Sequence, residues 1–99
     1  MEIQLQQQTI NGEFFIEDEQ KIKLAYLTFI MDNATEMRIN HTVVSEVLRG
    51  QGVARKLVDN AVQYARDKGY KIIPECTYTL SVFQKTPEYA NVWKNINGV

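Results

Sequence analysis

The sequence has few of the residues and stretches that commit a chain to a special environment. Of its 99 residues, one is cysteine, one is histidine and two are proline. A single cysteine excludes an internal disulfide and a zinc site built from several cysteines. No apolar run approaches the roughly 18 residues that a membrane-spanning helix needs, and the start Met1–Gln4 lacks the basic and apolar stretches of a signal peptide. We therefore expect a cytoplasmic protein without a metal site.

The chain also lacks an excess of either charge. Eleven basic and twelve acidic residues leave a net charge of −1, which gives no electrostatic attraction to nucleic acids or anionic membranes. An apolar share of 44% is ordinary for a globular protein. The length predicts a single domain over residues 1–99, with one small core.

The first part of the chain predicts hairpins. Asn11-Gly12 is a strong signal for a two-residue hairpin turn, which would join a strand within residues 3–10 to one within 13–17. Asp18-Glu19-Gln20 predicts the next turn.

Two longer strands follow. Residues 22–31 carry apolar groups on both faces, a pattern typical of a central strand covered on both sides. In residues 37–45 a strict alternation places four side chains on one face, namely Met37, Ile39, His41 and Val43.

The second half of the chain predicts helices around one short strand. Apolar residues recur at helical spacing at Ala54, Leu57, Val58, Ala61, Val62 and Ala65. Lys68-Gly69 is a suitable helix end, residues 71–73 predict a strand that Pro74 ends, and Pro87-Glu88 predicts the start of a short C-terminal helix. The predicted fold is α+β, a mostly antiparallel twisted sheet with a central amphipathic helix and short C-terminal helices.

A glycine-rich segment lies between the last of the four strands and the long helix. It comprises Arg49, Gly50, Gln51, Gly52, Val53 and Ala54. Such a turn leaves backbone N–H groups at a helix start without helical partners, where the helix dipole adds positive character. A pyrophosphate is a common ligand of such sites. The segment lacks the Gly-Lys-Ser/Thr of a P-loop and the three glycines of a dinucleotide fingerprint, and an ordinary strand-to-helix turn is the alternative interpretation.

Three motifs in order make the chain similar to the GNAT acetyltransferases. Their acetyl-CoA loop reads Gln/Arg-x-x-Gly-x-Gly/Ala, and Arg49, Gly52 and Ala54 occupy its fixed positions. The strings His41-Thr42-Val43-Val44 and Pro74-Glu75-Cys76-Thr77-Tyr78 extend the resemblance to a minimal single-domain GNAT subfamily, over roughly residues 10 to 93. The resemblance implies a GNAT-like fold, acetyl-CoA or coenzyme A as cofactor, and acetyl transfer to an amine.

The resemblance also implies which residues bind the cofactor. The backbone N–H groups of Gln51, Gly52, Val53 and Ala54, next to Gly50, would hold the pyrophosphate. Arg49 and Arg55 would add charge, although arginines near a helix start are often only solvated. The backbone of Val43 and Val44 would bind the pantetheine arm as an added strand does, while their side chains are ordinary core residues.

Four residues are catalytic candidates by the same resemblance. Cys76 follows the strand near the expected acetyl thioester and would accept the acetyl group; the alternative is a buried small apolar residue, and the neighbouring Glu75 would oppose its ionisation. His41 is a candidate general base or a core histidine, and Glu46 a candidate base or a turn residue. Tyr78 would protonate the leaving coenzyme thiolate, or serve only in packing.

Two functions of different class follow. One is an N-acetyltransferase acting on an unidentified amine, either directly or through Cys76. The other is a coenzyme A-binding module without transfer activity that acts through a protein partner, because Asn11-Gly12 stands where a typical GNAT has a helical region that helps form the acceptor site. A small interaction domain that only shares the fold is a third interpretation. The sequence identifies neither the acceptor nor the oligomeric state.

Overall fold

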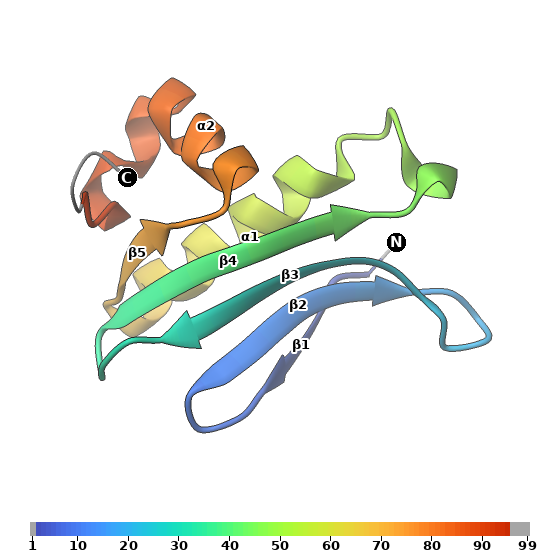
Figure 1. Ribbon diagram of the computed structural model, residues 1–99, viewed down its shortest axis with the longest axis horizontal. Helices are drawn as coiled ribbons and strands as arrows, with labels where there is room; N and C mark the ends of the chain where they lie inside the picture. The colour runs from blue at the N-terminus through green and yellow to red at the C-terminus, as the bar shows by residue number, and fades with distance from the viewer. Residues whose placement is uncertain (1, 96–99) are drawn as a thin grey trace.

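The computed structural model describes residues 2–95, which form one five-stranded sheet with helices packed against it (Figure 1). The elements in chain order are β1 (Gln4–Gln7), β2 (Asn11–Glu17), β3 (Lys23–Met31), β4 (Glu36–Val44), η1 (Glu46–Leu48), α1 (Val53–Lys68), β5 (Lys71–Pro74), α2 (Thr77–Lys85) and η2 (Pro87–Val92). The predicted α+β class and element order are confirmed. The predicted domain of 1–99 stays a prediction, and residues 1 and 96–99 lie outside the described residues. No helix among residues 2–95 is long and apolar enough to cross a membrane.

The strands lie in the order β1-β2-β3-β4-β5. The first four pair antiparallel, and β4 and β5 pair parallel with α1 as the crossover between them. The parallel pairing ends where Ile39 faces Pro74. The carbonyl of Ile39 then accepts the N–H groups of Glu75 and Cys76, both at 3.0 Å. Beyond that carbonyl β4 continues to Val44, while the segment that follows β5 turns away into α2. The sheet therefore opens between β4 and β5 at this point (Figure 1).

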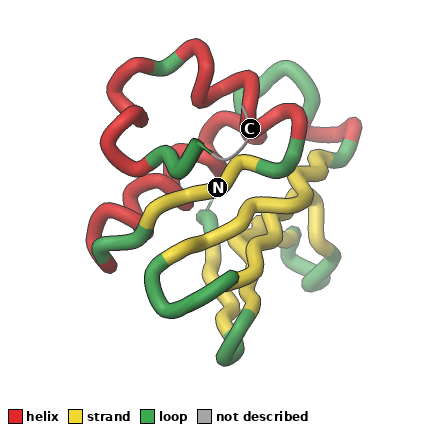
Figure 2. The backbone as a smooth tube through the Cα atoms, turned by 60° about the vertical axis from the view of Figure 1, so that its left-hand side comes forward, coloured by secondary structure: helices red, strands yellow, loops and turns green. Residues whose placement is uncertain are grey.

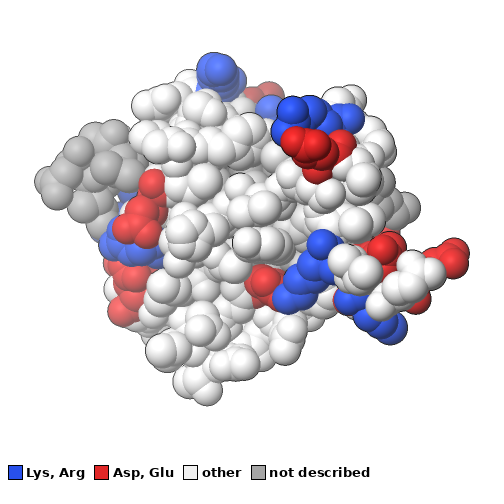
Figure 3. Space-filling model, turned by 45° about the vertical axis from the view of Figure 1, so that its right-hand side comes forward, with Lys and Arg blue, Asp and Glu red and all other residues white. Residues whose placement is uncertain are grey.

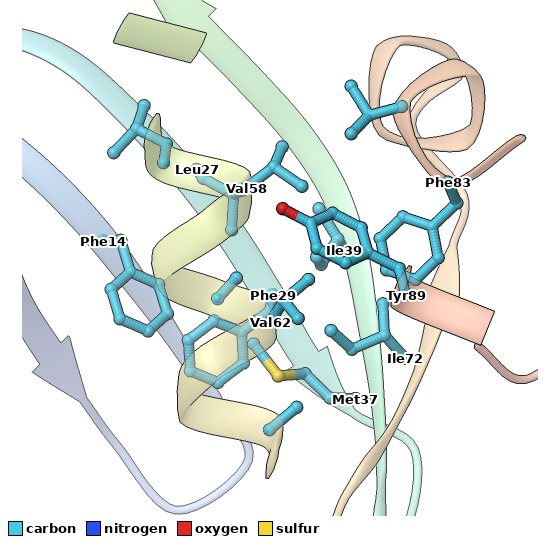
Figure 4. Packing of buried hydrophobic residues seen from close by; sticks show 14 of the residues in the cluster. Phe14, Leu27, Phe29, Met37, Ile39, Val58, Val62, Ile72, Phe83 and Tyr89 are labelled. Atoms are coloured by element: carbon cyan, nitrogen blue, oxygen red, sulfur yellow. The ribbon is translucent and has the colours of Figure 1, made fainter. Parts of the chain in front are cut away.

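One face of the sheet holds the core. The apolar stripe of α1 packs on it, and five of its six predicted members are buried; Ala54 is only part-buried, and Val53 is buried in addition. Figure 4 shows Val58 and Val62 of α1 among Phe14, Leu27 and Phe29. The predicted helix end at Lys68-Gly69 is confirmed, with Gly69 at φ 76° as the cap. Figure 2 shows the helical segments gathered together, with the strand hairpins projecting away from them.

The opposite face of the sheet is largely open. In β3 the side chains of Ala25, Leu27 and Phe29 are buried against α1, whereas Ile30 is 39% exposed. The prediction that this strand is covered on both sides is therefore wrong. The helix that packs on β3 is α1, and it covers a single face.

The predicted turn at Asn11-Gly12 is also wrong. Thr9 and Ile10 make the turn, the N–H of Gln8 donates to the carbonyl of Asn11 at 2.8 Å, and Asn11-Gly12 begins β2. Gly12 does not have the positive φ that the predicted turn would need. Its lack of a side chain instead admits the ring of Phe29, whose Cζ would lie 2.6 Å from a Cβ at this position. The turn predicted at Asp18-Glu19-Gln20 is confirmed, with the Asp18 carboxylate accepting the N–H of Gln20.

A β-bulge breaks the alternation of β4. Thr28 pairs with His41 while the next residue of β3, Phe29, pairs with Ile39, so Asn40 is an extra residue. Thr28 Oγ1 donates to the side-chain oxygen of this extra residue at 2.6 Å.

The bulge reverses which side chains of β4 face the core. Met37 and Ile39 are buried before it, but His41 and Val43 are exposed after it. The prediction that these four share one face is wrong, and so is the interpretation of His41 as a core histidine. The next residue along from His41, Thr42, turns inward instead.

The C-terminal segment closes one end of the core. Phe83 of α2 packs against Tyr89 at 5.3 Å and against Trp93 at 5.8 Å between ring centroids. Tyr89 is buried, and the guanidinium groups of Arg55 and Arg66 on α1 lie over its ring. The C-terminal aromatic residues thus attach this segment to α1.

Candidate active site

The start of α1 presents unpaired backbone donors. Gly50 has φ 82° and Gly52 φ 69°, backbone conformations that favour glycine. Gly52 is the N-cap residue, and the first helical hydrogen bond runs from the Lys56 N–H to its carbonyl at 3.1 Å. The N–H groups of Val53, Ala54 and Arg55 precede that bond, so α1 offers them no carbonyl. These donors and the helix dipole favour an anion here.

A pocket of about 210 Å³ opens at this helix start. It is lined by the end of β4, by η1 and the loop that follows it, by the first turn of α1, and by the first turn of α2. Its lining residues are Val44, Ser45, Leu48, Arg49, Gly50, Gly52, Val53, Ala54, Arg55 and Tyr78. Most of the residues predicted to bind the cofactor therefore surround one cavity, although Val43 and Gln51 do not line it.

Sequence reasoning missed two residues of this pocket. Ser45 Oγ accepts the N–H of Val47 at 3.4 Å and so caps η1, the short turn that carries the chain from β4 to the loop. Leu48, at the end of that turn, is buried and forms the apolar wall. A serine just after an apolar strand is a recognisable capping signal, but nothing in the sequence showed that η1 folds back toward Tyr78.

Only one of the two predicted valines faces the opening of the sheet. The N–H of Ser45 donates to the carbonyl of Leu24 at 2.7 Å, and Val43 pairs with Tyr26 of β3. The backbone N–H and C=O groups of successive residues in a strand point alternately to its two sides. The backbone groups of Val43 and Ser45 therefore face β3, and the N–H and C=O of Val44 point away from β3, toward the opening of the sheet. The side chain of Val43 is 44% exposed on the open face, so neither part of this residue reaches the pocket.

Cys76 is the N-cap residue of α2, beside the point where β4 and β5 part. Its thiol is half-buried, and the S–H donates a hydrogen bond to Oγ1 of Thr42, with 3.8 Å between sulfur and oxygen. The sulfur makes no full capping hydrogen bond, but the N–H groups of Thr79 and Tyr78 are directed at it. Burial raises the pKa of Cys76, whereas these N–H groups and the hydroxyls of Thr42 and Thr79 lower it, and the net result is a lowered pKa. Such an environment favours a reactive thiolate.

The neighbouring carboxylate of Glu75 shares the charge of Arg38 with another acidic residue. Arg38 Nη1 lies 3.5 Å from it, and the same guanidinium forms a closer pair with Asp32. The expected opposition of Glu75 to thiolate formation is therefore weakened.

Tyr78 lies in the first turn of α2, two residues after Cys76, and lines the pocket. Burial raises its pKa, the nearby Arg55 lowers it in part, and Asp59 and Cys76 raise it. The phenol is thus protonated at neutral pH and able to donate a proton into the pocket.

The other two catalytic candidates lie elsewhere. Glu46 is 86% exposed and pairs with Arg49 across 3.7 Å. His41 is exposed on the open face of the sheet, opposite to the side on which Thr42 meets Cys76. Neither residue lines the pocket, and neither does Cys76, which is the N-cap residue of the α2 turn that contributes Tyr78 to it.

The two arginines that line the pocket are paired with acidic residues, Arg49 with Glu46 at 3.7 Å and Arg55 with Asp59 at 3.0 Å. Figure 3 shows charged side chains in small groups of mixed sign, with uncharged surface between them. Among residues 2–95 no group of histidine, cysteine and acidic side chains is arranged to hold a metal ion. A second pocket of about 410 Å³ lies on the open face between Gln6, Glu13 and Asn40, and it contains none of the predicted site residues.

The sequence matches a family model, described as GCN5-related N-acetyl-transferase, over residues 13–92. The chain belongs to this family. Among curated GNAT relatives, N-acetyltransferase 8B of Rattus norvegicus is 36% identical over 64 residues, which are 54% of this chain and 29% of that protein. The chain thus spans less than a third of the length of that relative.

Solved GNAT structures share the fold. The NMR structure of a GCN5-like protein from Staphylococcus aureus superposes with a TM-score of 0.74 at 32% identity, covering 95% of this chain and 90% of that one. A GNAT acetyltransferase from Elizabethkingia anophelis with acetyl-CoA bound superposes with a TM-score of 0.57 at 19% identity, covering 76% of this chain and 52% of that one. The first comparison covers nearly the whole of both chains.

Proposed function

We propose that this protein binds acetyl-CoA and transfers the acetyl group to an amine, with Cys76 as the first acceptor. The observation that carries the proposal is the convergence of three parts on one opening of the sheet. These are the free N–H groups at the start of α1, the outward backbone edge of Val44, and the first turn of α2, from which Tyr78 lines the pocket and at whose N-cap Cys76 lies. Membership of the GNAT family supports it.

Each part matches one portion of acetyl-CoA as a substrate. The N–H groups of Val53, Ala54 and Arg55 suit the pyrophosphate, with the guanidinium groups of Arg49 and Arg55 at the rim of the pocket. The backbone of Val44 can pair with the amide-containing pantetheine arm as with an added strand. Acetyl-CoA supplies the activated acetyl group.

Cys76 and Tyr78, at the start of α2, carry out different steps of the transfer. Cys76, as a thiolate, attacks the acetyl carbonyl carbon, and the bond from that carbon to the coenzyme sulfur breaks. Tyr78 gives its phenolic proton to the departing sulfur, and solvent restores it. The amine then attacks acetyl-Cys76, the thiolate returns, and the amine loses a proton to water. Direct attack by the amine would need a base at the pocket, and the exposed positions of His41 and Glu46 favour the route through Cys76.

A reactive free thiol also agrees with the cytoplasmic location that the sequence predicts, because reducing compartments keep such thiols free. The location remains part of the proposal.

Backbone amide shifts and protein mass together test the proposal. On titration of isotope-labelled protein with acetyl-CoA, we expect saturable shifts at Gly52 to Arg55, followed by a gain of one acetyl group in mass. The Cys76→Ala variant should show the same shifts without the gain. Transfer to an amine at the wild-type rate by Cys76→Ala would exclude the covalent route, and the absence of shifts at near-millimolar acetyl-CoA would exclude binding.

A coenzyme A-binding module without transfer activity is the second candidate. One observation favours it: β1 and β2 are joined by the tight turn Thr9-Ile10, where a typical GNAT has helices that help form the acceptor site. In that case coenzyme A and acetyl-CoA would shift the same amides, and acetyl-Cys76 would persist in the presence of diverse amines.

A further inference from the structure

Three side chains from two elements meet behind the first turn of α2. Cys76 Sγ lies 3.8 Å from Thr42 Oγ1, and Thr42 Oγ1 lies 3.4 Å from Thr79 Oγ1. Thr79 is fully buried at the third position of α2, and Thr42 is part-buried on β4. The three groups thus form a short chain that runs from the half-exposed sulfur into the protein interior.

Thr42 reaches this position because of the bulge at Asn40. Met37 and Ile39 face the core before the bulge, so an uninterrupted strand would place Thr42 on the open face. The extra residue directs Thr42 to Cys76 and His41 away from it. The bulge therefore creates the contact between hydroxyl and sulfur.

We propose that Thr42 and Thr79 are positioning residues whose hydroxyl groups hold the Cys76 sulfur as a thiolate at the opening between β4 and α2. The inference rests on the proposed role of Cys76 in acetyl transfer. With the neutral thiol, the S–H donates to Thr42, and Thr42 can donate to Thr79. When the proton leaves to solvent, the chain reverses: Thr79 donates to Thr42, and Thr42 donates to the sulfur anion.

The charged groups near Cys76 do not provide an alternative explanation. Glu75 on one side is paired with Arg38, at 3.5 Å. Toward α1, Tyr78 faces Arg55, which is itself paired with Asp59 at 3.0 Å. The lowered pKa of Cys76 comes from N–H and hydroxyl donors, against the opposing effect of burial.

The pH dependence of Cys76 alkylation tests this inference without acetyl-CoA. Cys76 is the only cysteine in the sequence, so iodoacetamide labelling followed by mass reports on it alone. Valine has nearly the shape of threonine but no hydroxyl. We expect Thr42→Val to raise the midpoint of the pH profile by about one unit, a roughly tenfold loss of thiolate below the midpoint. Thr79→Val should raise it in the same direction, and Thr42→Ser should restore a midpoint close to that of the wild type.

Thr77→Val is the matched control, because Thr77 lies exposed in the same turn of α2. Its midpoint should not move. Unchanged midpoints in both Thr42→Val and Thr79→Val would overturn the inference, and so would a Thr42→Ser midpoint as high as that of Thr42→Val, which would indicate packing rather than hydrogen bonding.

The same variants distinguish this inference from the proposed function. If acetyl-CoA leaves wild-type Cys76 unmodified while the alkylation midpoint still depends on the two hydroxyls, the acetyl transfer route fails and the positioning role stands. If Cys76 is acetylated but its midpoint is indifferent to both hydroxyls, the positioning role fails alone.

Discussion

The backbone N–H of Cys76 donates to the carbonyl oxygen of Ile39 at 3.0 Å. Ile39 is the last residue of β4 that pairs with β5, and the bulge at Asn40 follows it directly. One carbonyl therefore fixes the first turn of α2 at the place where the sheet opens, and the bulge beside it selects which side chain meets the sulfur. The strand ladder, rather than a loop, holds the candidate nucleophile, which gives the site a rigid support.

Gly52→Ala should weaken acetyl-CoA binding more than its effect on stability explains. Gly52 has φ 69°, so alanine costs about 1–2 kcal/mol of backbone strain, and its methyl group would stand where a phosphate approaches the start of α1. We expect a lower melting temperature and at least a tenfold loss of affinity for coenzyme A, measured by amide-shift titration on the folded variant.

Gly69→Ala is the control for that change. Gly69 caps the other end of α1 at φ 76°, and no atom lies within 4 Å of a Cβ built at either glycine. The two variants should lose similar stability, while Gly69→Ala keeps its affinity. Equal losses of affinity in both would mean that the start of α1 is not the phosphate site.

The pocket at the start of α1 was largely predictable because most of its residues belong to a contiguous segment. The glycines at 50 and 52 mark backbone conformations that other residues adopt at a cost, and the helix that follows has an unbroken apolar stripe. Tyr78 was predictable only through the family motif. No local pattern reveals that the first turn of α2 folds against the start of α1, because that depends on where β4 and β5 separate.

Arg55→Ala should lower the affinity for coenzyme A by about two- to fivefold, since a half-exposed charge contributes little in water. The loss should shrink as salt is added, because screening already weakens the interaction in the wild type. Arg66→Ala is the matched change: Arg66 lies over the same Tyr89 ring, at 5.8 Å against 5.5 Å for Arg55, but outside the pocket. An equal loss in Arg66→Ala would assign the effect to packing around Tyr89.

The rate of Cys76 acetylation should fall as the pH is lowered. Burial raises the folded-state pKa of Cys76, but the N–H of Thr79 and the threonine hydroxyls lower it by more, so the net shift is downward. The thiolate is therefore present above that lowered pKa and lost as the pH falls through it, so acetylation by acetyl-CoA should stay fast below the ordinary cysteine pKa of about 8.5. Stopped-time mass measurements against pH check this. A profile centred at or above the ordinary value would contradict the expected thiolate.

His41→Ala should leave both stability and Cys76 acetylation nearly unchanged. The imidazole is exposed on the open face, and surface changes typically stay within about 0.5 kcal/mol. The rate of acetyl transfer to an added amine at neutral pH should also stay within about twofold of the wild type. A tenfold or greater fall would restore His41 as a base and would require the amine to approach from the open face.

His41 lies on the opposite face of β4 from the one that the sequence pattern predicts, and the cause cannot be read from the sequence of this strand. Alternation from Met37 to Val43 is continuous in the sequence, and nothing in Asn40 itself announces an extra residue. The bulge is a property of the pairing with β3, because it places Thr28 opposite His41 while Phe29 still meets Ile39. The prediction at Asn11-Gly12 was wrong for a related reason: Gly12 lies opposite Phe29 on the neighbouring strand β3 and makes room for its ring, so it is needed for a contact between strands and not for a local turn.

Gly12→Ala should destabilise the fold by about 1–3 kcal/mol, because an added Cβ would lie 2.6 Å from Phe29 Cζ and 2.9 Å from the carbonyl oxygen of Gln6. Thermal unfolding measures the loss. In a Phe29→Leu background the shorter side chain makes room, so the same change should cost less, although contact with the Gln6 carbonyl keeps part of the penalty. The two losses form a double-mutant cycle whose coupling measures the close approach of the ring. If Gly12→Ala is equally costly in both backgrounds, the penalty comes from the contact with the Gln6 carbonyl and not from Phe29.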